Sequence, residues 1–329
     1  MKFDVLIIGG GLAGLTCGIR LQKNGVKCAI VSTGQSALHF SSGSFDLLNE
    51  LPDGTKVDNP MAAVGKVSAN HPYAKLGSEF AYYVHEAKQQ FLDLGIEVAG
   101  DAEQNHLRIT PMGTLKPTWL TFSDFTPFSS ASDMAGKKIR VVNMAGFLDF
   151  NTKFVADSFE KYGAKCQISS INLPELERLR ISPTEMRSTN IARVLENEKT
   201  LEALIMELAG TVSGFDVVAL PAVFGLSSVA PVRRLKEALN IPVWLIPTMP
   251  PSVPGIRAQQ QLRRSFEELG GVYMLGDTVV KADFKGNKVQ SVYSVNHGDI
   301  SFVAENFVLA SGSYFSNGSV SYTHLTLPT

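Results

Sequence analysis

The stretch Asp4-Val-Leu-Ile-Ile-Gly-Gly-Gly-Leu-Ala-Gly14 decides the fold of this chain. Its apolar residues 5–8 predict a strand, and the glycines that follow predict a tight turn that opens a helix. The helix is expected to end at Asn24-Gly25, and residues 26–31 form a second apolar strand. A strand, a glycine turn, a helix and a strand in this order predict a βαβ unit that binds a nucleotide.

The glycines have the spacing G-x-G-x-x-G, through Gly9, Gly11 and Gly14. In this motif the first glycine allows the tight turn, the second lets the backbone approach a pyrophosphate, and the third lets the helix pack on the sheet. Together with Leu12 and Ala13 they present main-chain N–H groups at the positive end of the helix dipole. We therefore predict that these five residues bind the phosphates of a dinucleotide or a flavin nucleotide.

Ser32 occupies the place after the second strand where an acidic residue usually binds the adenosine ribose. A serine makes a neutral hydrogen bond but not the charge-assisted pair that a carboxylate makes. Two interpretations follow from this substitution. Either Ser32 binds the ribose of FAD through a neutral bond, or the cofactor has no adenosine and is FMN.

Small residues dominate the next segment, Gly34-Gln-Ser-Ala-Leu-His-Phe-Ser-Ser-Gly-Ser44. In flavoproteins this segment often crosses beneath the pyrophosphate and the flavin ring. We predict that Ser42, Gly43 and Ser44 contact the cofactor, and the alternative is an ordinary surface loop. His39 is a candidate base for the hydroxyl proton of an alcohol substrate, and the alternative is a structural histidine.

Further elements are expected in the rest of the chain. Residues 138–142 predict a strand, followed by a helix through Phe154 and Phe159 and a strand near 166–168, which is a second βαβ pattern. Residues 244–255 are rich in proline and predict a rigid crossing between domains. Arg257 follows this crossing, where it either clamps a phosphate or pairs with a carboxylate.

The C-terminal part of the chain predicts one helix and several strands. The helix is expected at 256–269, and the strands are expected at 272–275, 279–284, 288–296, 299–303 and 307–312. The last strand ends at Gly312, which is a further predicted cofactor contact.

The whole pattern predicts an α/β protein, with a Rossmann-like FAD/NAD(P)-binding domain and an inserted α+β cap domain. The nucleotide-binding domain is assigned to residues 1–45 and 255–318. The cap, on the substrate side, is assigned to residues 46–254.

Composition excludes several other classes of protein. The 329 residues include 30 Lys and Arg against 31 Asp and Glu, and no basic run indicates a nucleic acid partner. Cys17, Cys28 and Cys166 lie far apart in apolar segments, which favours buried thiols of a reducing compartment over disulfides. No Cys/His cluster predicts a metal site, and no apolar run approaches the ~20 residues of a membrane span.

Several strings of residues resemble the family formed by the B subunit of anaerobic glycerol-3-phosphate dehydrogenase. Besides the segment that ends at Ser44, they include Thr110-Pro-Met-Gly-Thr-Leu115, Asn190-Ile-Ala-Arg193 and Pro250-Pro-Ser-Val-Pro-Gly-Ile-Arg257. The resemblance runs from Met1 to about Gly318. Within it, Val308-Leu-Ala-Ser-Gly312 resembles the second phosphate-side motif of flavoproteins with two dinucleotide-binding domains.

The resemblance implies a flavin-containing subunit of an enzyme that oxidises sn-glycerol 3-phosphate to dihydroxyacetone phosphate. Electrons would pass to quinone and on to fumarate or nitrate. It implies FMN as the cofactor, with FAD as the alternative, and pairing with the A subunit of the same enzyme in a catalytic dimer. It also implies an iron–sulfur C subunit that anchors the dimer at the cytoplasmic face of the inner membrane. Two other functions stay open: a non-catalytic interaction subunit with a vestigial nucleotide-binding fold, and a stand-alone FAD oxidoreductase.

The last residues, Ser319-Val-Ser-Tyr-Thr-His-Leu-Thr-Leu-Pro-Thr329, depart from the family. They resemble a translated sequencing adapter. We therefore expect residues 319–329 to be an artefactual tail, and the native chain to continue with a further part of the nucleotide-binding fold.

Overall fold

The computed structural model describes residues 1–182 and 184–313, so the expectation for residues 319–329 lies outside the described residues. Contacts within the chain divide it into two compact units. Unit 1 contains Met1–Leu38 and the described chain from Ala258 onward, and unit 2 contains His39–Arg257. These limits lie a few residues from the boundaries predicted above. The assignment of a cofactor role to one part and a substrate role to the other stays a prediction.

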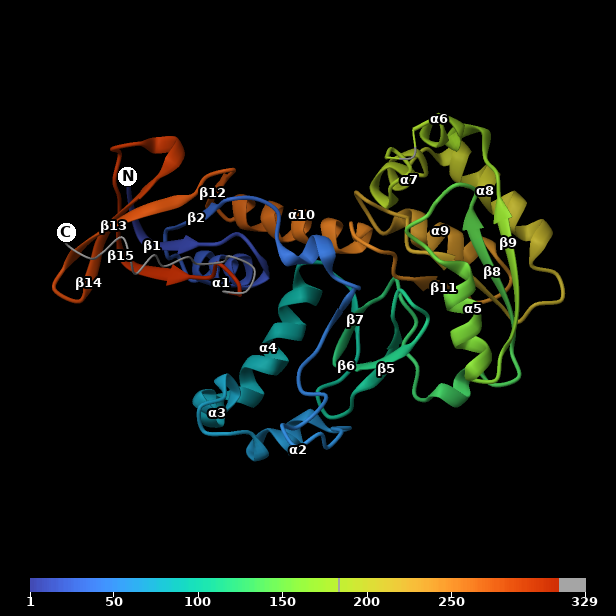
Figure 1. Ribbon diagram of the computed structural model, residues 1–329. Coiled ribbons are helices and arrows are strands. Elements are labelled where there is room, and N and C mark those ends of the chain that lie inside the picture. Colours follow the sequence, from blue (N-terminus) through green and yellow to red (C-terminus); the bar gives the residue numbers. More distant parts are fainter. Residues whose placement is uncertain (183, 314–329) are drawn as a thin grey trace, which may run out of the picture. The chain divides into compact units, whose positions relative to one another are not determined.

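Unit 1 is built on a six-stranded sheet in the order β12-β2-β1-β15-β14-β13 (Figure 1). Its parallel part contains β1 (Lys2–Ile8), β2 (Cys28–Ser32), β12 (Val272–Leu275) and β15 (Phe302–Leu309). The strands β13 (Val279–Lys285) and β14 (Lys288–Ser294) form an antiparallel hairpin beside β15. Helix α1 (Leu12–Lys23) connects β1 to β2, which confirms the predicted βαβ unit.

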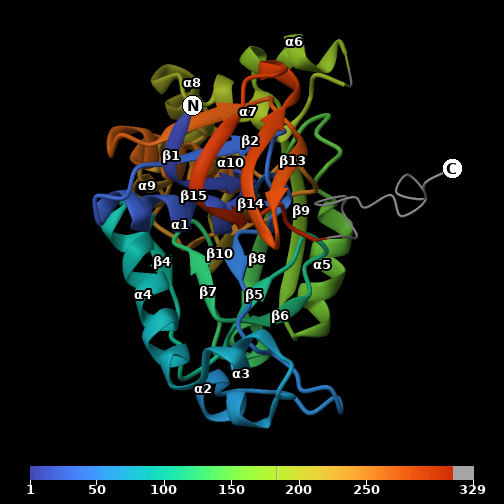
Figure 2. The ribbon, with the colours of Figure 1, turned by 90° about the vertical axis from the view of Figure 1, so that its left-hand side faces the viewer.

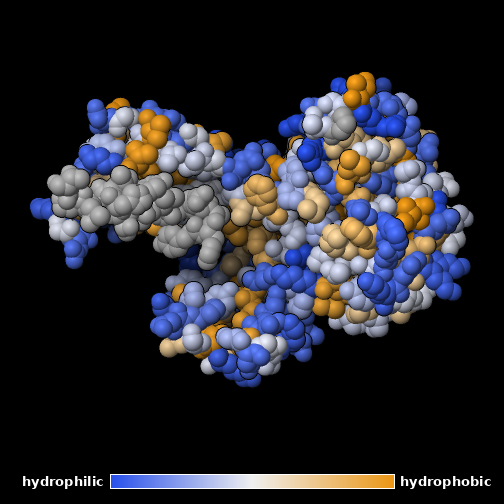
Figure 3. Space-filling model, viewed as in Figure 1, coloured by the Kyte–Doolittle hydropathy of each residue, from blue (hydrophilic) through white to orange (hydrophobic). Residues whose placement is uncertain are grey.

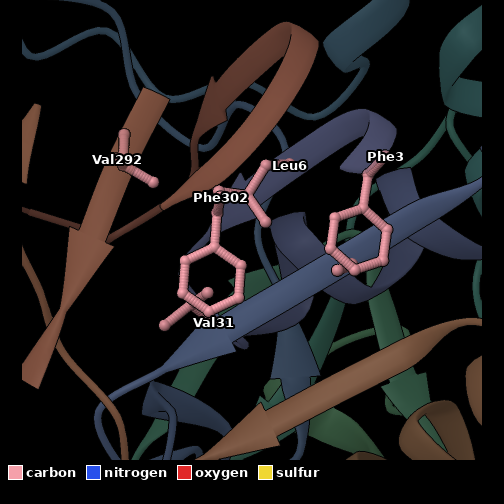
Figure 4. Close-up of a cluster of buried hydrophobic side chains, with 6 residues drawn as sticks. Phe3, Leu6, Val31, Val292 and Phe302 are labelled. Carbon is pink, nitrogen blue, oxygen red and sulfur yellow. The ribbon is translucent and has the colours of Figure 1, made fainter. Parts of the chain in front are cut away.

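The core of unit 1 joins residues from both ends of the chain. Phe3 and Leu6 of β1 pack with Val31 of β2, and Val292 and Phe302 come from the C-terminal meander (Figure 4). Leu6 and Phe302 are completely buried. Because each buried apolar side chain stabilises the fold by about 1.5–3 kcal/mol, this cluster makes the N-terminal βαβ unit depend on the distant meander.

Three boundaries in this region differ from the sequence prediction. The strands expected at 299–303 and 307–312 are one strand, β15 (Phe302–Leu309), because residues on both sides of the expected gap pair with β1 in one register. Helix α10 (Val253–Glu268) begins before residue 256, since Pro254 lies in its first turn, where a proline needs no hydrogen bond. Val243–Ile246 is the buried strand β11 and not part of a crossing segment.

The sheet of unit 1 ends at an irregular strand. β13 pairs with β14 through two shifts of register, one between Val279 and Lys281 and one between Asp283 and Phe284. Such shifts are β-bulges, which bend a strand and increase its twist. This edge of the sheet also carries the charged side chains of Lys281 and Lys285.

Unit 2 contains a four-stranded parallel sheet in the order β11-β10-β8-β9. The remaining strands of this sheet are β8 (Lys138–Met144), β9 (Lys165–Ile171) and β10 (Val217–Pro221). Helix α5 (Thr152–Lys161) connects β8 to β9 and lies beside both strands (Figures 1 and 2), which confirms the second βαβ pattern. The other helices of this part are α6 (Glu177–Arg180), α7 (Ser188–Val194), α8 (Glu198–Thr211) and α9 (Ala230–Ala238).

The rest of unit 2 is antiparallel. A small sheet joins β3 (Ser44–Phe45), β7 (Leu120–Phe122) and β4 (Val98–Ala99), and a hairpin joins β5 (His106–Ile109) to β6 (Leu115–Thr118). The helices here are α2 (Pro60–Ala63), α3 (Pro72–Leu76) and α4 (Phe80–Asp93). The ring of Phe45 stacks on Phe91 of α4 at 5.0 Å between centroids, and this contact fixes α4 to the small sheet.

The face of the molecule in Figure 3 is mostly hydrophilic over unit 2, with hydrophobic residues scattered among the polar ones. Scattered apolar residues are normal on a protein surface. Among the described residues, no helix combines the length and the apolar character needed to cross a membrane.

We predict that Phe302→Ala lowers the free energy of unfolding by about 3–5 kcal/mol, because it leaves a cavity in the core of unit 1. Phe284→Ala is the matched control, since Phe284 is 66% exposed on β13 of the same sheet. We expect the control to change stability by less than about 0.5 kcal/mol. Urea unfolding of both variants measures the difference. Equal midpoints for the two variants would show that the meander does not stabilise the βαβ unit.

Candidate phosphate-binding site of the glycine turn

The glycine turn lies at the carboxyl ends of β1 and β15, which are neighbouring parallel strands of the sheet. In open α/β sheets ligands bind outside the carboxyl ends of the strands. Gly9 has φ +115°, and a β-carbon there would overlap the carbonyl of Ala310. A β-carbon at Gly14 would likewise overlap the carbonyl oxygen of Gly9. The turn therefore needs glycine at both positions to pack against its own sheet and helix.

Gly11 is different, because among the described residues only Ser36 lies beside it. A β-carbon at Gly11 would meet only the β-carbon of Ser36, at an ordinary 3.5 Å. Gly11 is the N-cap of α1, and no side chain caps the helix. Among the described residues, the N–H groups of Gly11, Leu12 and Ala13 have no acceptor. Unpaired N–H groups at a helix start are a ready site for an oxyanion, so the turn fits a nucleotide phosphate.

The carbonyl of Gly10 holds the turn in this orientation. It accepts hydrogen bonds from the Tyr273 hydroxyl at 3.1 Å and from Nε2 of Gln259 at 3.5 Å. The Oε1 atom of Gln259 in turn accepts from the hydroxyl of Ser36 at 2.7 Å. Because side chains of β12 and α10 donate hydrogen bonds to this carbonyl, the turn keeps its free N–H groups together. Sequence analysis missed Tyr273 and Gln259, since neither belongs to the glycine motif.

Ser32 lies at the carboxyl end of β2, next to the glycine turn, as expected. Its side chain is buried, and its hydroxyl donates to the carbonyl of Gly34 at 3.0 Å. Its carbonyl accepts from the N–H groups of Gly276 and Asp277. The adjoining hydroxyls of Thr33 and Thr278 lie 3.1 Å apart. The groups at this strand end are therefore neutral hydroxyls, and Ser32 can offer a ribose only a neutral hydrogen bond.

Asp277 lies at this strand end, because its N–H donates to the carbonyl of Ser32. The oxygens of its carboxylate, however, already accept hydrogen bonds from other residues. Oδ1 accepts from the backbone of Thr278 and Asn296, and Oδ2 lies 2.8 Å from Nδ1 of His297. Burial opposes ionisation of this carboxyl, yet hydrogen bonds from Ser294, Asn296, His297 and Thr278 outweigh the burial and lower the pKa of Asp277. Asp277 thus stabilises the turn after β14 and does not replace the missing ribose acid.

Gly312 follows the end of β15 in unit 1. It has φ +89°, a conformation that favours glycine, and a β-carbon there would meet no atom of residues 1–182 and 184–313 within 4 Å. The backbone of Ala310, two residues before it, donates to the carbonyl of Ile8 at 2.8 Å. The open space at Gly312 is compatible with its predicted contact to a cofactor, which stays a prediction.

The other predicted cofactor contacts belong to unit 2 and have structural explanations. Gly43 has φ +82°, and a β-carbon there would overlap the ring of Phe125. Ser44 pairs with Thr121 in the small antiparallel sheet. Ser42 precedes these two residues in the same turn. Their predicted contact with a cofactor stays untested, but the glycine at position 43 is already required by packing.

His39 lies in a 3₁₀ turn, Ala37–Phe40, and its side chain is buried. Its carbonyl accepts a hydrogen bond from the N–H of Ser252 at 2.7 Å. This backbone contact joins two segments of unit 2. The predicted role of His39 as a base stays a prediction, because a contact of the backbone does not test the chemistry of the ring.

Arg257 forms an internal ion pair, which corrects the first of its two predicted roles, that of a phosphate clamp. Its Nη2 lies 2.6 Å from both carboxylate oxygens of Asp124, and its Nη1 donates to the carbonyl of Gly225. Both side chains are buried. Removing one partner of a buried ion pair leaves an uncompensated charge, so this arginine is not free to bind a phosphate. The alternative stated above, pairing with a carboxylate, is the one that the structure has.

The described residues contain no cluster of three or more His, Cys, Asp or Glu side chains that would hold a metal ion. The glycine turn itself offers main-chain N–H groups that can bind an oxyanion.

Known proteins resemble this chain over most of its length. It matches the family of FAD binding domains over residues 4–321. The B subunit of anaerobic glycerol-3-phosphate dehydrogenase from Yersinia enterocolitica is 45% identical over 334 residues, which cover 100% of this chain and 79% of that protein. The B subunit of the same enzyme from Pectobacterium atrosepticum is 43% identical over 324 residues, which cover 97% of this chain and 77% of that protein. Among solved structures, glycine oxidase from Geobacillus kaustophilus has a TM-score of 0.35 and 14% identity, over 95% of this chain and 56% of its own.

We predict that Gly11→Ala abolishes flavin binding without unfolding the chain. The added methyl group meets only Ser36 in the flavin-free fold, but it occupies the space that a phosphate needs. Gly14→Ala should instead destabilise the protein, because its methyl group overlaps the backbone of Gly9. Gly210→Ala is a matched control with no neighbour within 4 Å. Flavin absorbance and thermal unfolding of the three variants test this, and Gly11→Ala protein with wild-type flavin content would contradict it.

We predict that Asp277→Asn destabilises the protein by about 2 kcal/mol at neutral pH, since it removes a charged acceptor of several hydrogen bonds. The folded-state pKa of Asp277 is lowered, so its stabilisation is present above the unfolded pKa of about 4 and is lost as pH falls through the folded pKa. The difference between wild type and variant should therefore shrink in acid. Denaturant unfolding at several pH values measures it, with the exposed Asp299→Asn as control. A pH-independent difference would show that the charge is not involved.

Proposed function

We propose that this chain is the flavin-containing subunit of a membrane-associated dehydrogenase. The chain belongs to the family formed by the B subunit of anaerobic glycerol-3-phosphate dehydrogenase, and it contains an FAD-binding domain. The proposed reaction oxidises sn-glycerol 3-phosphate to dihydroxyacetone phosphate, and the electrons pass to quinone in anaerobic respiration with fumarate or nitrate. The observation that carries the proposal is the set of free N–H groups at Gly11, Leu12 and Ala13.

In this proposal the residues of unit 1 bind and orient the flavin nucleotide. Gly9 and Gly14 let the turn close against β15 and α1, and Gly11 leaves room for the phosphate. Tyr273 and Gln259 hold the carbonyl of Gly10, so the turn needs little reorganisation when the anion binds. A bound flavin supplies the acceptor for the hydride of the alcohol carbon.

The adenosine part of the cofactor separates FMN from FAD. The family match favours FAD, since the matching family is that of FAD binding domains. The neutral end of β2 favours FMN, because Ser32 replaces the ribose-binding acid and Asp277 is committed elsewhere. Both cofactors place a phosphate at the glycine turn. We therefore propose a flavin nucleotide, and the choice between FMN and FAD depends on the chemical analysis described below.

The relatives are named as one subunit of a larger enzyme, which supports a multi-subunit assembly for this chain. We propose that the chain pairs with the A subunit in the catalytic dimer and that an iron–sulfur C subunit holds the dimer at the cytoplasmic face of the inner membrane. Such an anchor would bring the flavin close to the quinone pool.

The proposal is tested by co-expressing the chain with its partner subunits and analysing the purified complex. We predict a yellow preparation, and acid release followed by chromatography then identifies FMN or FAD. Glycerol 3-phosphate should reduce an added quinone analogue, and Gly11→Ala in this chain should lower the rate at least about tenfold, if loss of the phosphate contacts costs about 1.4 kcal/mol or more.

A second function predicts a different result. If the chain were a non-catalytic interaction subunit with a vestigial nucleotide-binding fold, Gly11→Ala would leave both assembly and quinone reduction unchanged. A folded, colourless chain that takes up neither FMN nor FAD would refute the flavin proposal. A chain that carries flavin but purifies alone would instead indicate a stand-alone oxidoreductase.

A further inference from the structure

Unit 2 contains a buried arginine without an ionic partner. Arg108 lies on β5 of the antiparallel hairpin (Figure 1) and is only 7% exposed. Its Nη1 donates to the carbonyl of Ile109 at a long 3.5 Å, and its Nε is buried without any hydrogen-bond partner. Within the described part of the chain, Nη2 has no acceptor and the guanidinium forms no ion pair. A charge in this position is costly unless it is paired.

The pairing of the hairpin explains why no carboxylate compensates Arg108. Arg108 stands opposite Lys116 in the register of β5 and β6. The nearby carboxylate of Asp46 is bound by Lys116. Two cations thus share one carboxylate, and that carboxylate is paired with the lysine. Burial lowers the pKa of Arg108, and the charge of Asp46 offsets this effect only in part.

His106 is the neighbour of Arg108 on the same face of the hairpin, because residues two apart on a strand point the same way. Its Nε2 lies 2.7 Å from the hydroxyl of Thr121, and its Nδ1 is buried without a partner. Thr121 is completely buried, and its hydroxyl has no other acceptor among the described residues. Burial, and after it the charge of Arg108, lower the pKa of His106.

These contacts leave one edge of the guanidinium, formed by Nε and Nη2, without any acceptor in the described part of the chain. This edge presents two parallel N–H groups, which is the geometry that binds a carboxylate or a phosphate through two hydrogen bonds. Because Asp46 neutralises Lys116, Arg108 supplies one unpaired positive charge, which attracts an anion to this edge. A phosphate monoester has both the geometry and the charge.

We propose that the Nε–Nη2 edge of Arg108 binds the phosphate of a phosphate monoester, and that this ligand is sn-glycerol 3-phosphate. The identity of the ligand rests on the proposed function, whereas the anion site rests on the contacts of Arg108 alone. Arg108 binds the phosphate and does not take part in the transfer of hydride. The site thus adds a substrate-binding role to unit 2.

The test measures binding of sn-glycerol 3-phosphate and of inorganic phosphate to the full chain by calorimetry. We expect Arg108→Met to weaken binding of both ligands at least tenfold. We expect Arg108→Lys to weaken it less, because the charge stays and only the two-pronged geometry is lost. Arg140→Met is the matched control: Arg140 also has a buried Nε without a partner, but it stacks on Phe215 at 5.2 Å and belongs to β8. The Arg140→Met variant should bind both ligands with the affinity of wild type.

Stability without ligand gives a second readout that a purely structural arginine would not produce. Replacing an uncompensated buried charge by an apolar side chain of similar size should keep or raise the thermal midpoint. Phosphate should then raise the midpoint of wild type but not that of Arg108→Met. Two results together would overturn the proposal and assign Arg108 a structural role. The first is a thermal midpoint of Arg108→Met below that of wild type, and the second is an Arg108→Lys variant that binds phosphate as tightly as wild type does.

The outcomes also separate this inference from the proposed function. If the complex carries flavin and oxidises glycerol 3-phosphate while Arg108→Met binds both ligands as wild type does, the anion site is wrong and the proposed function stands. If both ligands bind through Arg108 but the complex neither carries flavin nor oxidises glycerol 3-phosphate, the anion site stands and the proposed function fails. If inorganic phosphate binds through Arg108 and glycerol 3-phosphate does not, the ligand assignment is wrong.

Discussion

The close approach of the glycine turn to its own backbone is the constraint on which unit 1 depends. At Gly9 the chain passes so near Ala310 that a single carbon atom does not fit, and at Gly14 the helix passes equally near Gly9. These contacts bring the end of β1, the start of α1 and the end of β15 to one point. The residues involved are about 300 positions apart in the sequence. The hydrophobic core around Leu6 and Phe302 supplies the stability that holds this point together.

The nucleotide-binding part of the fold could be predicted from the sequence because its signals are local. An apolar strand, three spaced glycines and a helix end at Asn24-Gly25 are all readable within one short stretch. The contacts that orient the turn could not be read in this way. Tyr273 and Gln259 reach Gly10 only through the pairing of β12 with β2 and through the course of α10. Long-range contacts of this kind leave no periodic pattern in one sequence.

The errors of sequence analysis have the same physical origin. Sequence analysis predicts two strands, 299–303 and 307–312, yet pairing with β1 makes residues 302–309 the single strand β15. The sequence leaves two partners open for Arg257, a phosphate and a carboxylate, and it does not point to the carboxylate of Asp124, which is 133 residues away. Arg108 shows the reverse case. Nothing in its local sequence distinguishes it, and only the folded hairpin shows that its charge is buried without a carboxylate.

The irregular strand β13 has a consequence for the behaviour of this protein at high concentration. An exposed sheet edge offers unpaired backbone groups to which a second molecule can add its own strand. β13 exposes Val280 and Phe284, which are the kind of apolar side chains that promote such association. Its two bulges and its lysines at positions 281 and 285 counteract this, since a bent, charged edge is a poor template for aggregation. The same edge therefore protects the solubility of unit 1 although Val280 and Phe284 lie on its surface.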